Sequence, residues 1–288
     1  MTTTEEPPAV LRYAAFAATP EGGNPAGIVL SAGELDGSAM QGIAAEVGYA
    51  ETAFVTERDV TGDPRRLRIR FFSPVAEVPF CGHATIATAI ALAEREGVGT
   101  FVFDTPVGPV VIETTAGAAG IVAAFTSVEP ELAPLEPEIE NELLSLLGLM
   151  RSDLDARYPL RSAFAGNWHP IVVVRDRARF DGFTFDPASM RTLMDAQGWQ
   201  GTVSVLHATT PTDFAARNLF PVGTLTEDPA TGSAAASLGG YLRATGSIAA
   251  PATVVVHQGE HVGRPSLLTV EIPRSGGIVV SGSAVTIA

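Results

Sequence analysis

The sequence predicts an α/β fold of the α+β type, made of two similar domains that each wrap a curved, strand-rich layer around a helix of small residues. The chain has 288 residues and 46% of them are hydrophobic, so it can form a core in each of two ordinary domains. A stretch that begins at Glu77 recurs in the same order from Glu227, and strand-like runs flank both copies. We interpret this duplication as two domains of one architecture.

In each copy of the repeated stretch, a proline-containing turn precedes one small residue, a glycine and an alanine-rich run. The small residue is Cys81 or Thr231, and the glycine is Gly82 or Gly232. Alanine has the highest helix propensity, so each copy predicts a turn that leads into a helix. The first amides of a helix lack intrahelical partners and lie at the positive end of its dipole. Both helix starts are therefore suited to an anion.

Hydrophobic periodicity and the spacing of glycine and proline predict the other elements. In the first half we expect a helix at residues 38–47 and strands at 10–17, 26–30, 52–55, 67–72, 100–103, 107–114 and 120–125. In the second half we expect helices at 138–147 and 187–197 and strands at 171–174, 203–208, 252–257, 267–272 and 277–287. Residues 217–226 are expected to be irregular, and the second alanine-rich helix to end near Gly246.

A segment rich in proline and glutamate, residues 128–137, has the composition of a linker. We place the domain boundary there, which gives domains at 1–127 and 128–276. The final strand, at about 277–288, can return to the first domain.

The composition excludes several classes of function. Eighteen basic and 32 acidic residues give a formal charge of −14, which repels nucleic acid and anionic membrane surfaces. Residues 84–93 are apolar but too few to span a bilayer. The single cysteine excludes an intrachain disulfide, and the first residues lack the basic and apolar segments of a secretory signal, so we expect a cytoplasmic location.

Two titratable side chains are candidates for acid/base chemistry. Glu51 enters a short apolar strand, where burial can raise the pKa of a carboxyl group as a general base requires, although a solvated strand end gives the same pattern. His83 follows Gly82 at the first helix start, where it can contact a ligand or only cap the helix.

The same turns hold further polar residues whose roles the pattern leaves open. A thiol such as Cys81 beside a helix start can be a nucleophile or a base, but a small buried apolar residue is the simpler interpretation. Ser233 can cap the second helix or contact a ligand, and Asp228 can do the same or close its turn.

Nucleotide cofactors and the serine hydrolase class have no support, because the sequence has no glycine-rich dinucleotide motif, Walker loop or serine nucleophile elbow. No metal is predicted either. His257 and His261 are four residues apart, but Gly259 and the strand-like residues before it argue against a shared helical face.

Five blocks of residues together resemble the phenazine biosynthesis PhzF-like family, in the family's order and over essentially the whole chain. The blocks are Gly23-Asn24-Pro25-Ala26-Gly27, Glu51-Thr52-Ala53-Phe54-Val55, Phe71-Phe72-Ser73-Pro74 with Glu77 to Thr85, Glu227-Asp228-Pro229-Ala230-Thr231-Gly232-Ser233-Ala234, and Gln258-Gly259 with Gly263-Arg264-Pro265-Ser266.

The resemblance implies the diaminopimelate epimerase fold, with two similar domains, each a curved and mostly antiparallel sheet around a central helix, and an active site in the cleft between them. It implies isomerase activity without a cofactor and a homodimer. By this resemblance Glu51 is the catalytic acid/base, and His83 and Asp228 hold or protonate the substrate. Gly82, Gly232 and Ser233 correspond to anion-binding helix starts.

One departure bears on the mechanism. Related amino acid racemases use a cysteine at each repeated turn, whereas here the second turn has Thr231, whose hydroxyl is too weakly acidic to replace a thiol. We therefore expect proton relocation by Glu51 on a small carboxylate-bearing substrate, with Cys81 and Thr231 in substrate contact. Two alternatives stay open: an unsymmetrical epimerase that pairs Cys81 with Glu51, and a carboxylate-binding protein without turnover.

Overall fold

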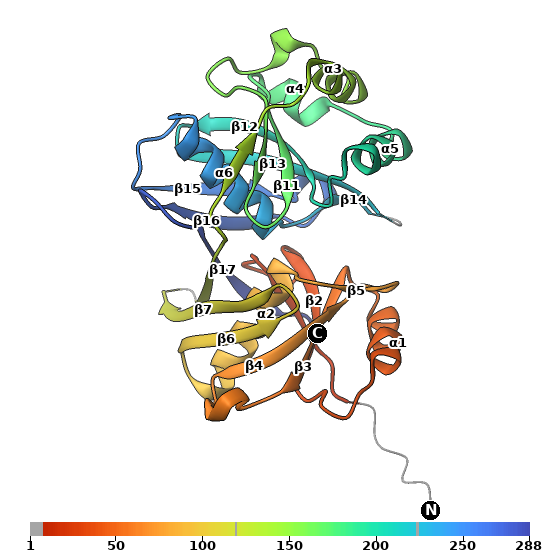
Figure 1. Ribbon diagram of the computed structural model, residues 1–288, viewed down its shortest axis with the longest axis vertical. Helices are drawn as coiled ribbons and strands as arrows, with labels where there is room; N and C mark the ends of the chain where they lie inside the picture. The colour runs from red at the N-terminus through yellow and green to blue at the C-terminus, as the bar shows by residue number, and fades with distance from the viewer. Residues whose placement is uncertain (1–7, 119, 223–224) are drawn as a thin grey trace, which may run out of the picture. The chain divides into compact units, whose positions relative to one another are not determined.

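The computed structural model describes residues 8–118, 120–222 and 225–288, and the chain forms two compact units (Figure 1). Unit 1 contains Asn24–Phe125, Gly282–Ala288 and the N-terminal segment up to Pro20. Unit 2 contains Glu21–Gly23 and Thr126–Ser281. The last strand therefore contributes residues to both units.

Unit 1 is built mainly from strands. In chain order its elements are β1 (Leu11–Ala15), β2 (Asn24–Val29), α1 (Gly37–Val47), β3 (Glu51–Glu57), β4 (Arg66–Phe72), β5 (Glu77–Val78), α2 (Gly82–Glu96), β6 (Gly99–Thr105), β7 (Gly108–Gly117), β8 (Gly120–Thr126) and the end of β17 (Val279–Thr286). The helix α1 is capped at both ends. The Asp36 carboxylate accepts from the Ala39 amide at its start, and Gly48 ends it in the left-handed conformation.

The strand pairings of unit 1 return to the strand at which they begin. In order the ring is β1, β2, β3, β4, β6, β7, β8 and β17, and β17 pairs with β1. Two neighbours in this ring, β2 with β3 and β4 with β6, are parallel. The sheet of unit 1 is thus a closed and mostly antiparallel ring.

The helix α2 lies inside this ring and contacts β1, β2, β3 and β7 (Figure 1). Every residue from His83 to Ala93 is buried, and most of them are alanine or threonine. Small side chains are needed here because strands approach the helix from several sides. The sheet is equally tight, since a Cβ on Gly27 would lie 2.6 Å from the Thr52 hydroxyl.

Unit 2 contains more helices. Its elements are β9 (Glu131–Ala133), α3 (Pro137–Leu146), β10 (Arg161–Phe164), β11 (Trp168–Val173), α4 (Arg177–Gly182), α5 (Pro187–Gln197), β12 (Val203–Thr210), β13 (Asp213–Val222), β14 (Leu225–Asp228), α6 (Gly232–Ala244), β15 (Ala252–Gln258), β16 (Ser266–Ile272) and the start of β17.

Unit 2 repeats the strand order of unit 1. The parallel pair β11 and β12 corresponds to β2 and β3, and the parallel pair β13 and β15 corresponds to β4 and β6. In each unit a helix of small residues follows a short strand, as α2 follows β5 and α6 follows β14. The duplication seen in the sequence is therefore a duplication of topology.

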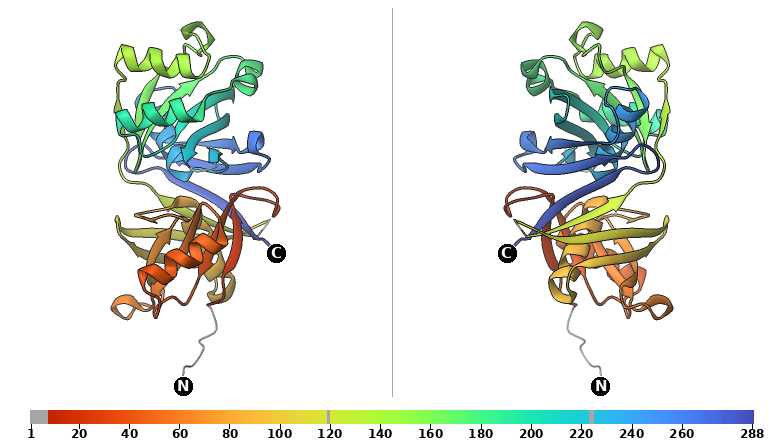
Figure 2. Two further views of the ribbon diagram at one scale, coloured as in Figure 1. Left: turned by 90° about the vertical axis from the view of Figure 1, so that its right-hand side faces the viewer. Right: turned by 90° about the vertical axis from the view of Figure 1, so that its left-hand side faces the viewer.

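Both faces of the unit 2 sheet are covered (Figure 2). The helix α6 packs against β9, β10, β11 and β16, while α4 packs on β12 and α5 on β13. A large cluster of buried apolar side chains lies on the face covered by α4 and α5, and it includes Leu143, Phe180, Met190 and Trp199. Strands that are buried on both faces form continuous apolar runs, which explains the sequence of β11 and β12.

The prediction that residues 217–226 are irregular is wrong. The strand β13 runs through Val222, and β14 begins at Leu225, the next residue that the structure describes. Arg217 interrupted the apolar pattern, but it lies in a buried ion pair with Glu227, with 2.5 Å between its Nη2 and a carboxylate oxygen. It also donates to the carbonyls of Phe180 and Phe183. Removal of one partner of such a pair costs about 3–5 kcal/mol.

The sequence also gave no sign of β9, β10 and α4. The strand β9 lies within the segment of linker composition at 128–137 and pairs with β10, itself only four residues long. The short helix α4 begins at an N-cap, Asp176, which accepts from the Arg179 amide. Elements this short carry too few residues for a periodic signal. Among the described residues, no helix has the length and apolarity of a membrane span.

The packing of α6 gives a first prediction. A Cβ on Gly240 would lie 2.3 Å from the Cβ of Pro130, so Gly240→Ala should destabilise unit 2 by about 1–3 kcal/mol. Gly42 is a matched control on α1, because no atom lies within 4 Å of its ideal Cβ. Gly42→Ala should stabilise the protein by about 0.5–1 kcal/mol through helix propensity. Urea unfolding measures both, and equal effects of the two substitutions would contradict the prediction.

Candidate active site

Three of the predicted site residues meet in unit 1. Glu51 is the first residue of β3, Cys81 is the N-cap of α2, and His83 is the second residue of that helix. The strand β3 lies beside β2 with Glu51 opposite Ala26, which brings the carboxylate to the start of the central helix.

The three side chains are in mutual contact. The Cys81 Sγ lies 3.5 Å from the Glu51 Oε2 and 3.3 Å from the His83 Nδ1. The His83 Nε2 lies 3.4 Å from the same carboxylate oxygen. His83 and Cys81 are buried, and the Glu51 side chain keeps 18% of its surface exposed. The cluster is thus a carboxyl, a thiol and an imidazole in a largely dry site.

Burial lowers the pKa of His83 to about 3, and a hydrogen bond to the Pro25 backbone opposes that shift. The imidazole is therefore neutral at physiological pH. Proline has no amide hydrogen, so the Pro25 partner is its carbonyl and one ring nitrogen of His83 donates to it. Neutral imidazole has one N–H, which leaves the second ring nitrogen as an acceptor for the thiol or a protonated carboxyl group.

Both central helices begin without a side-chain cap. Neither Cys81 nor Thr231, the N-cap residues of α2 and α6, accepts a hydrogen bond from the first turn of its helix. Gly82 and Gly232 open the two helices. The first-turn amides thus keep the anion-binding character that the sequence indicated.

The remaining predicted residues lie in unit 2, around the start of α6. Asp228 ends β14 and accepts from the Thr231 hydroxyl at 2.5 Å. The Gln258 amide nitrogen donates to the Thr231 hydroxyl and the Asp228 carbonyl. The Asn218 side chain donates in turn to the Gln258 carbonyl oxygen at 2.7 Å. A chain of buried amides therefore fixes the turn that carries Asp228.

Ser233, the second residue of α6, is held by a buried histidine. Its Oγ lies 3.0 Å from the Nε2 of His169, and the His169 Nδ1 lies 3.0 Å from both the amide nitrogen and the carbonyl oxygen of Thr202. Either tautomer of His169 therefore finds a partner at Thr202. Burial lowers the pKa of His169 to about 4, so this imidazole is also neutral.

The family model described as phenazine biosynthesis-like protein, PhzC-PhzF, matches residues 13–288. The chain belongs to this PhzF-like family.

Individual relatives agree with this membership. The chain is 33% identical to an uncharacterised isomerase of Deinococcus radiodurans, over 91% of this chain and 86% of that one. It is 30% identical to the trans-2,3-dihydro-3-hydroxyanthranilate isomerase of Pseudomonas chlororaphis, over 94% of each. The PhzF-family protein of Bacillus anthracis has a solved structure that matches with a TM-score of 0.82 and 27% identity, covering 97% of this chain and 96% of that one.

These relatives establish an isomerase of the PhzF-like family. The fold extends further, because a probable proline racemase from Agrobacterium radiobacter matches with a TM-score of 0.64 at 12% identity. The predicted diaminopimelate epimerase-like α+β fold is therefore confirmed, and the alternative of a protein without turnover loses its support.

Two motifs by which the PhzF-like family was identified meet in unit 2. The Arg264 guanidinium donates to the carbonyls of Gly22 and Gly23, and the Gly23 amide donates to the Pro265 carbonyl. Gly259 has φ +82°, and a Cβ there would lie 2.2 Å from the Arg264 carbonyl oxygen. Only glycine fits this turn.

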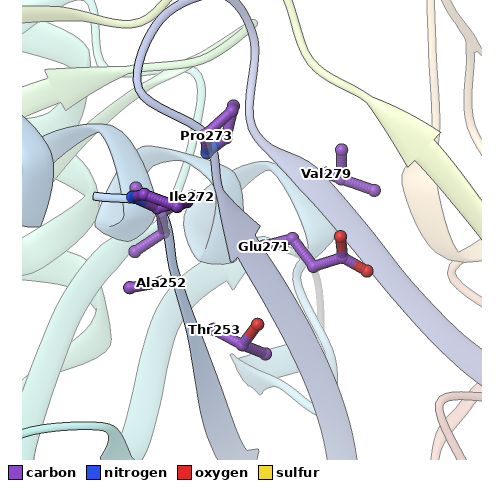
Figure 3. Close-up of a pocket in the computed structure, with 7 residues that line it drawn as sticks. Ala252, Thr253, Glu271, Ile272, Pro273 and Val279 are labelled. Atoms are coloured by element: carbon purple, nitrogen blue, oxygen red, sulfur yellow. The ribbon is translucent and has the colours of Figure 1, made fainter.

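The sequence did not reveal the residues that hold the candidate site residues of this isomerase in place. It gave no role to His169, to Asn218 or to the Pro25 carbonyl. Gln258 and Pro25 did lie in the blocks that carried the family resemblance, which was the available signal. A pocket elsewhere in unit 2, beside Thr253, Glu271 and Pro273, contains none of the predicted site residues (Figure 3).

The two buried histidines predict how stability depends on pH. Their folded-state pKa values lie below the ordinary value of 6.5. Between these values the two histidines are protonated in the unfolded chain but neutral in the folded protein. Stability should fall as pH drops below about 6.5, by about 1.4 kcal/mol per pH unit for each histidine, and the loss should continue until the folded pKa values of about 4 and about 3 are reached.

This prediction is checked by urea unfolding between about pH 7 and about pH 5, where carboxyl groups of ordinary pKa remain ionised. The His83→Gln variant should lose the contribution of one histidine to the slope of unfolding free energy against pH. An unchanged slope in that variant would show that His83 does not resist protonation in the folded state.

Proposed function

We propose that this isomerase relocates a proton on a small carboxylate-bearing substrate, with Glu51 as the general acid/base and no cofactor. The observation that carries the proposal is the contact of the Glu51 carboxylate with Cys81 and His83 at an uncapped helix start. The relative from Pseudomonas chlororaphis is named for an isomerisation of a cyclic amino acid, which supports a substrate of this class.

Glu51 is the best candidate base among the three grouped side chains. His83 has a strongly lowered pKa and hence little affinity for a proton. Its neutral ring can instead accept a hydrogen bond from the carboxyl group when Glu51 is protonated. Glu51 also keeps part of its side chain exposed, as contact with a substrate requires, whereas His83 is 7% exposed. A positioned acid/base group of this kind contributes about 10²–10⁴-fold to a rate.

Local donors must bind the substrate carboxylate, because the formal charge of −14 repels anions at long range. In unit 1 the proposed donors are the amides of Gly82 and His83, and Gly232 and Ser233 offer donors of the same kind in unit 2. Each charge-assisted hydrogen bond contributes about 1.5–3 kcal/mol. Asp228 and Thr231 remain proposed substrate contacts of unit 2.

Replacement of Glu51 tests the proposal. Glu51→Gln should reduce the exchange of substrate hydrogen with deuterated solvent by at least about 10²-fold, because the amide keeps the shape but cannot take a proton. The assay is deuterium incorporation by mass spectrometry, first with trans-2,3-dihydro-3-hydroxyanthranilate and then with other small cyclic and amino carboxylates.

Glu57 provides a matched control on the same strand. It is the last residue of β3 and forms an exposed ion pair with Arg68, so Glu57→Gln should exchange hydrogen at the rate of the natural protein. If Glu51→Gln retains the full exchange rate on a substrate that the natural protein turns over, Glu51 is not the base.

A second candidate function is an unsymmetrical epimerase in which Cys81 and Glu51 act as opposed acid and base. The Cys81 Sγ, 3.5 Å from the Glu51 Oε2, supplies the second acid/base group that this mechanism needs, and the substrate carbon would have to enter between the two. A symmetric pair of thiols is not available, because the second turn has Thr231, whose hydroxyl donates to Asp228.

The Cys81→Ala variant separates the two candidates. Proton relocation by Glu51 should survive the loss of the thiol within about tenfold, because the cysteine would then only shape the site. The epimerase mechanism should lose inversion at the α-carbon, and only the stereoisomer whose hydrogen faces Glu51 should still exchange with solvent. The measurement is deuterium incorporation combined with chiral analysis of the product.

A further inference from the structure

We propose that Glu51, Cys81 and His83 also form a binding site for a divalent cation of the zinc class, and that the bound cation inhibits the enzyme. The cation site goes beyond the proposed function. Its inhibitory effect rests on that function, because inhibition requires that Glu51 be the base.

The three side chains offer the ligand types that zinc prefers, which are a thiolate, an imidazole nitrogen and a carboxylate oxygen. Among the described residues they are grouped so that one ligand atom from each lies within 4.8 Å of the others. Glu51 and Cys81 are 30 residues apart in sequence. Ligand spacing along the chain therefore gave no sign of the site, and only the fold assembles it.

The distances among the ligand atoms suit one tetrahedral ion. They are 3.4 Å between the His83 Nε2 and the Glu51 Oε2, 3.5 Å from that oxygen to the Cys81 Sγ, and 3.7 Å from the sulfur to the His83 Nε2. Bonds of about 2.3 Å to sulfur and about 2.0–2.1 Å to nitrogen and oxygen give tetrahedral edges of about 3.4–3.6 Å. The Cys81 sulfur lies nearer to the His83 Nδ1, at 3.3 Å, than to the Nε2, so the imidazole must also turn to direct a nitrogen lone pair at the ion.

The charges also balance. A thiolate and a carboxylate together neutralise a dication, which lowers the cost of its burial. The formal charge of −14 draws cations toward the protein. Three protein ligands leave the fourth position for water, as in open zinc sites.

A bound cation would compete with acid/base chemistry, because it would occupy the carboxylate lone pair that Glu51 needs to accept a proton. A proton must leave the thiol as the metal binds, so affinity should rise with pH.

The test is a titration of the full-length protein with Co²⁺ in a reductant that contains no thiol. The chain has a single cysteine, so any thiolate-to-cobalt absorption in the near ultraviolet reports Cys81. We expect such a band to saturate at one cobalt per chain and to disappear when Zn²⁺ is added. Cys81→Ser should abolish the band, and Glu51→Gln should weaken Co²⁺ binding by at least about tenfold.

His257→Gln is the control variant, because His257 and Asp213 form an exposed pair 3.2 Å apart that could also attract a metal. This variant should bind cobalt as the natural protein does. The absence of a thiolate band in the natural protein would overturn the proposal. Equal Co²⁺ affinity in folded Cys81→Ser, measured by calorimetry, would overturn it as well.

The binding measurement uses no substrate, so its result is independent of the proposed function. If the cobalt band forms but Zn²⁺ at saturation leaves solvent exchange unchanged, the cation site stands and the inhibitory role is refuted, along with the role of Glu51 as base. If Zn²⁺ abolishes exchange in the natural protein and in His257→Gln but not in Cys81→Ser, both parts are supported.

Discussion

The burial of α2 inside a closed ring of strands is the constraint on which the rest of unit 1 depends. A helix that is buried along its length must carry small side chains, and its polar groups must find partners nearby. Thr85 and Thr88 therefore donate to the carbonyls of Cys81 and Ala84, one turn earlier on the helix itself. The larger polar group, His83, lies at the helix start, where the Pro25 carbonyl accepts a hydrogen bond from its ring. Burial thus produces the neutral imidazole of the candidate site.

The two units share a framework and differ in chemistry. An arginine in the strand before each repeated turn pairs with the first glutamate of that turn, as Arg70 with Glu77 and Arg217 with Glu227. The first pair is partly exposed and the second is buried. The duplicated framework therefore places equivalent turns, while a thiol and an imidazole occupy the first turn and a hydroxyl and a network of amides the second. This asymmetry favours proton relocation over symmetric racemisation.

Sequence patterns predicted those parts of the molecule whose signals are local. The helices α1 and α5 lie close to their expected positions, because each has an aspartate N-cap and a left-handed glycine at its end. The strand at Arg217 was missed because its polar side chain is satisfied by Glu227 and by distant carbonyls. The contact of Glu51 with Cys81 and His83 depends on the register of β2 with β3, which no local pattern encodes. Only the resemblance to a family pointed to those three residues together.

The protonation of the cluster limits the possible mechanisms. Because its pKa is lowered to about 3, His83 does not hold a proton at physiological pH. It therefore does not act as a second proton-carrying group beside Glu51. The Thr231 hydroxyl is engaged with Asp228 and does not supply an opposed thiol. In the mechanism that we propose, a proton taken from one substrate carbon remains on Glu51 until it is returned to another carbon. A single base of this kind moves a proton between two carbons on one face of a substrate, whereas a racemase needs acid/base groups on opposite faces of one carbon.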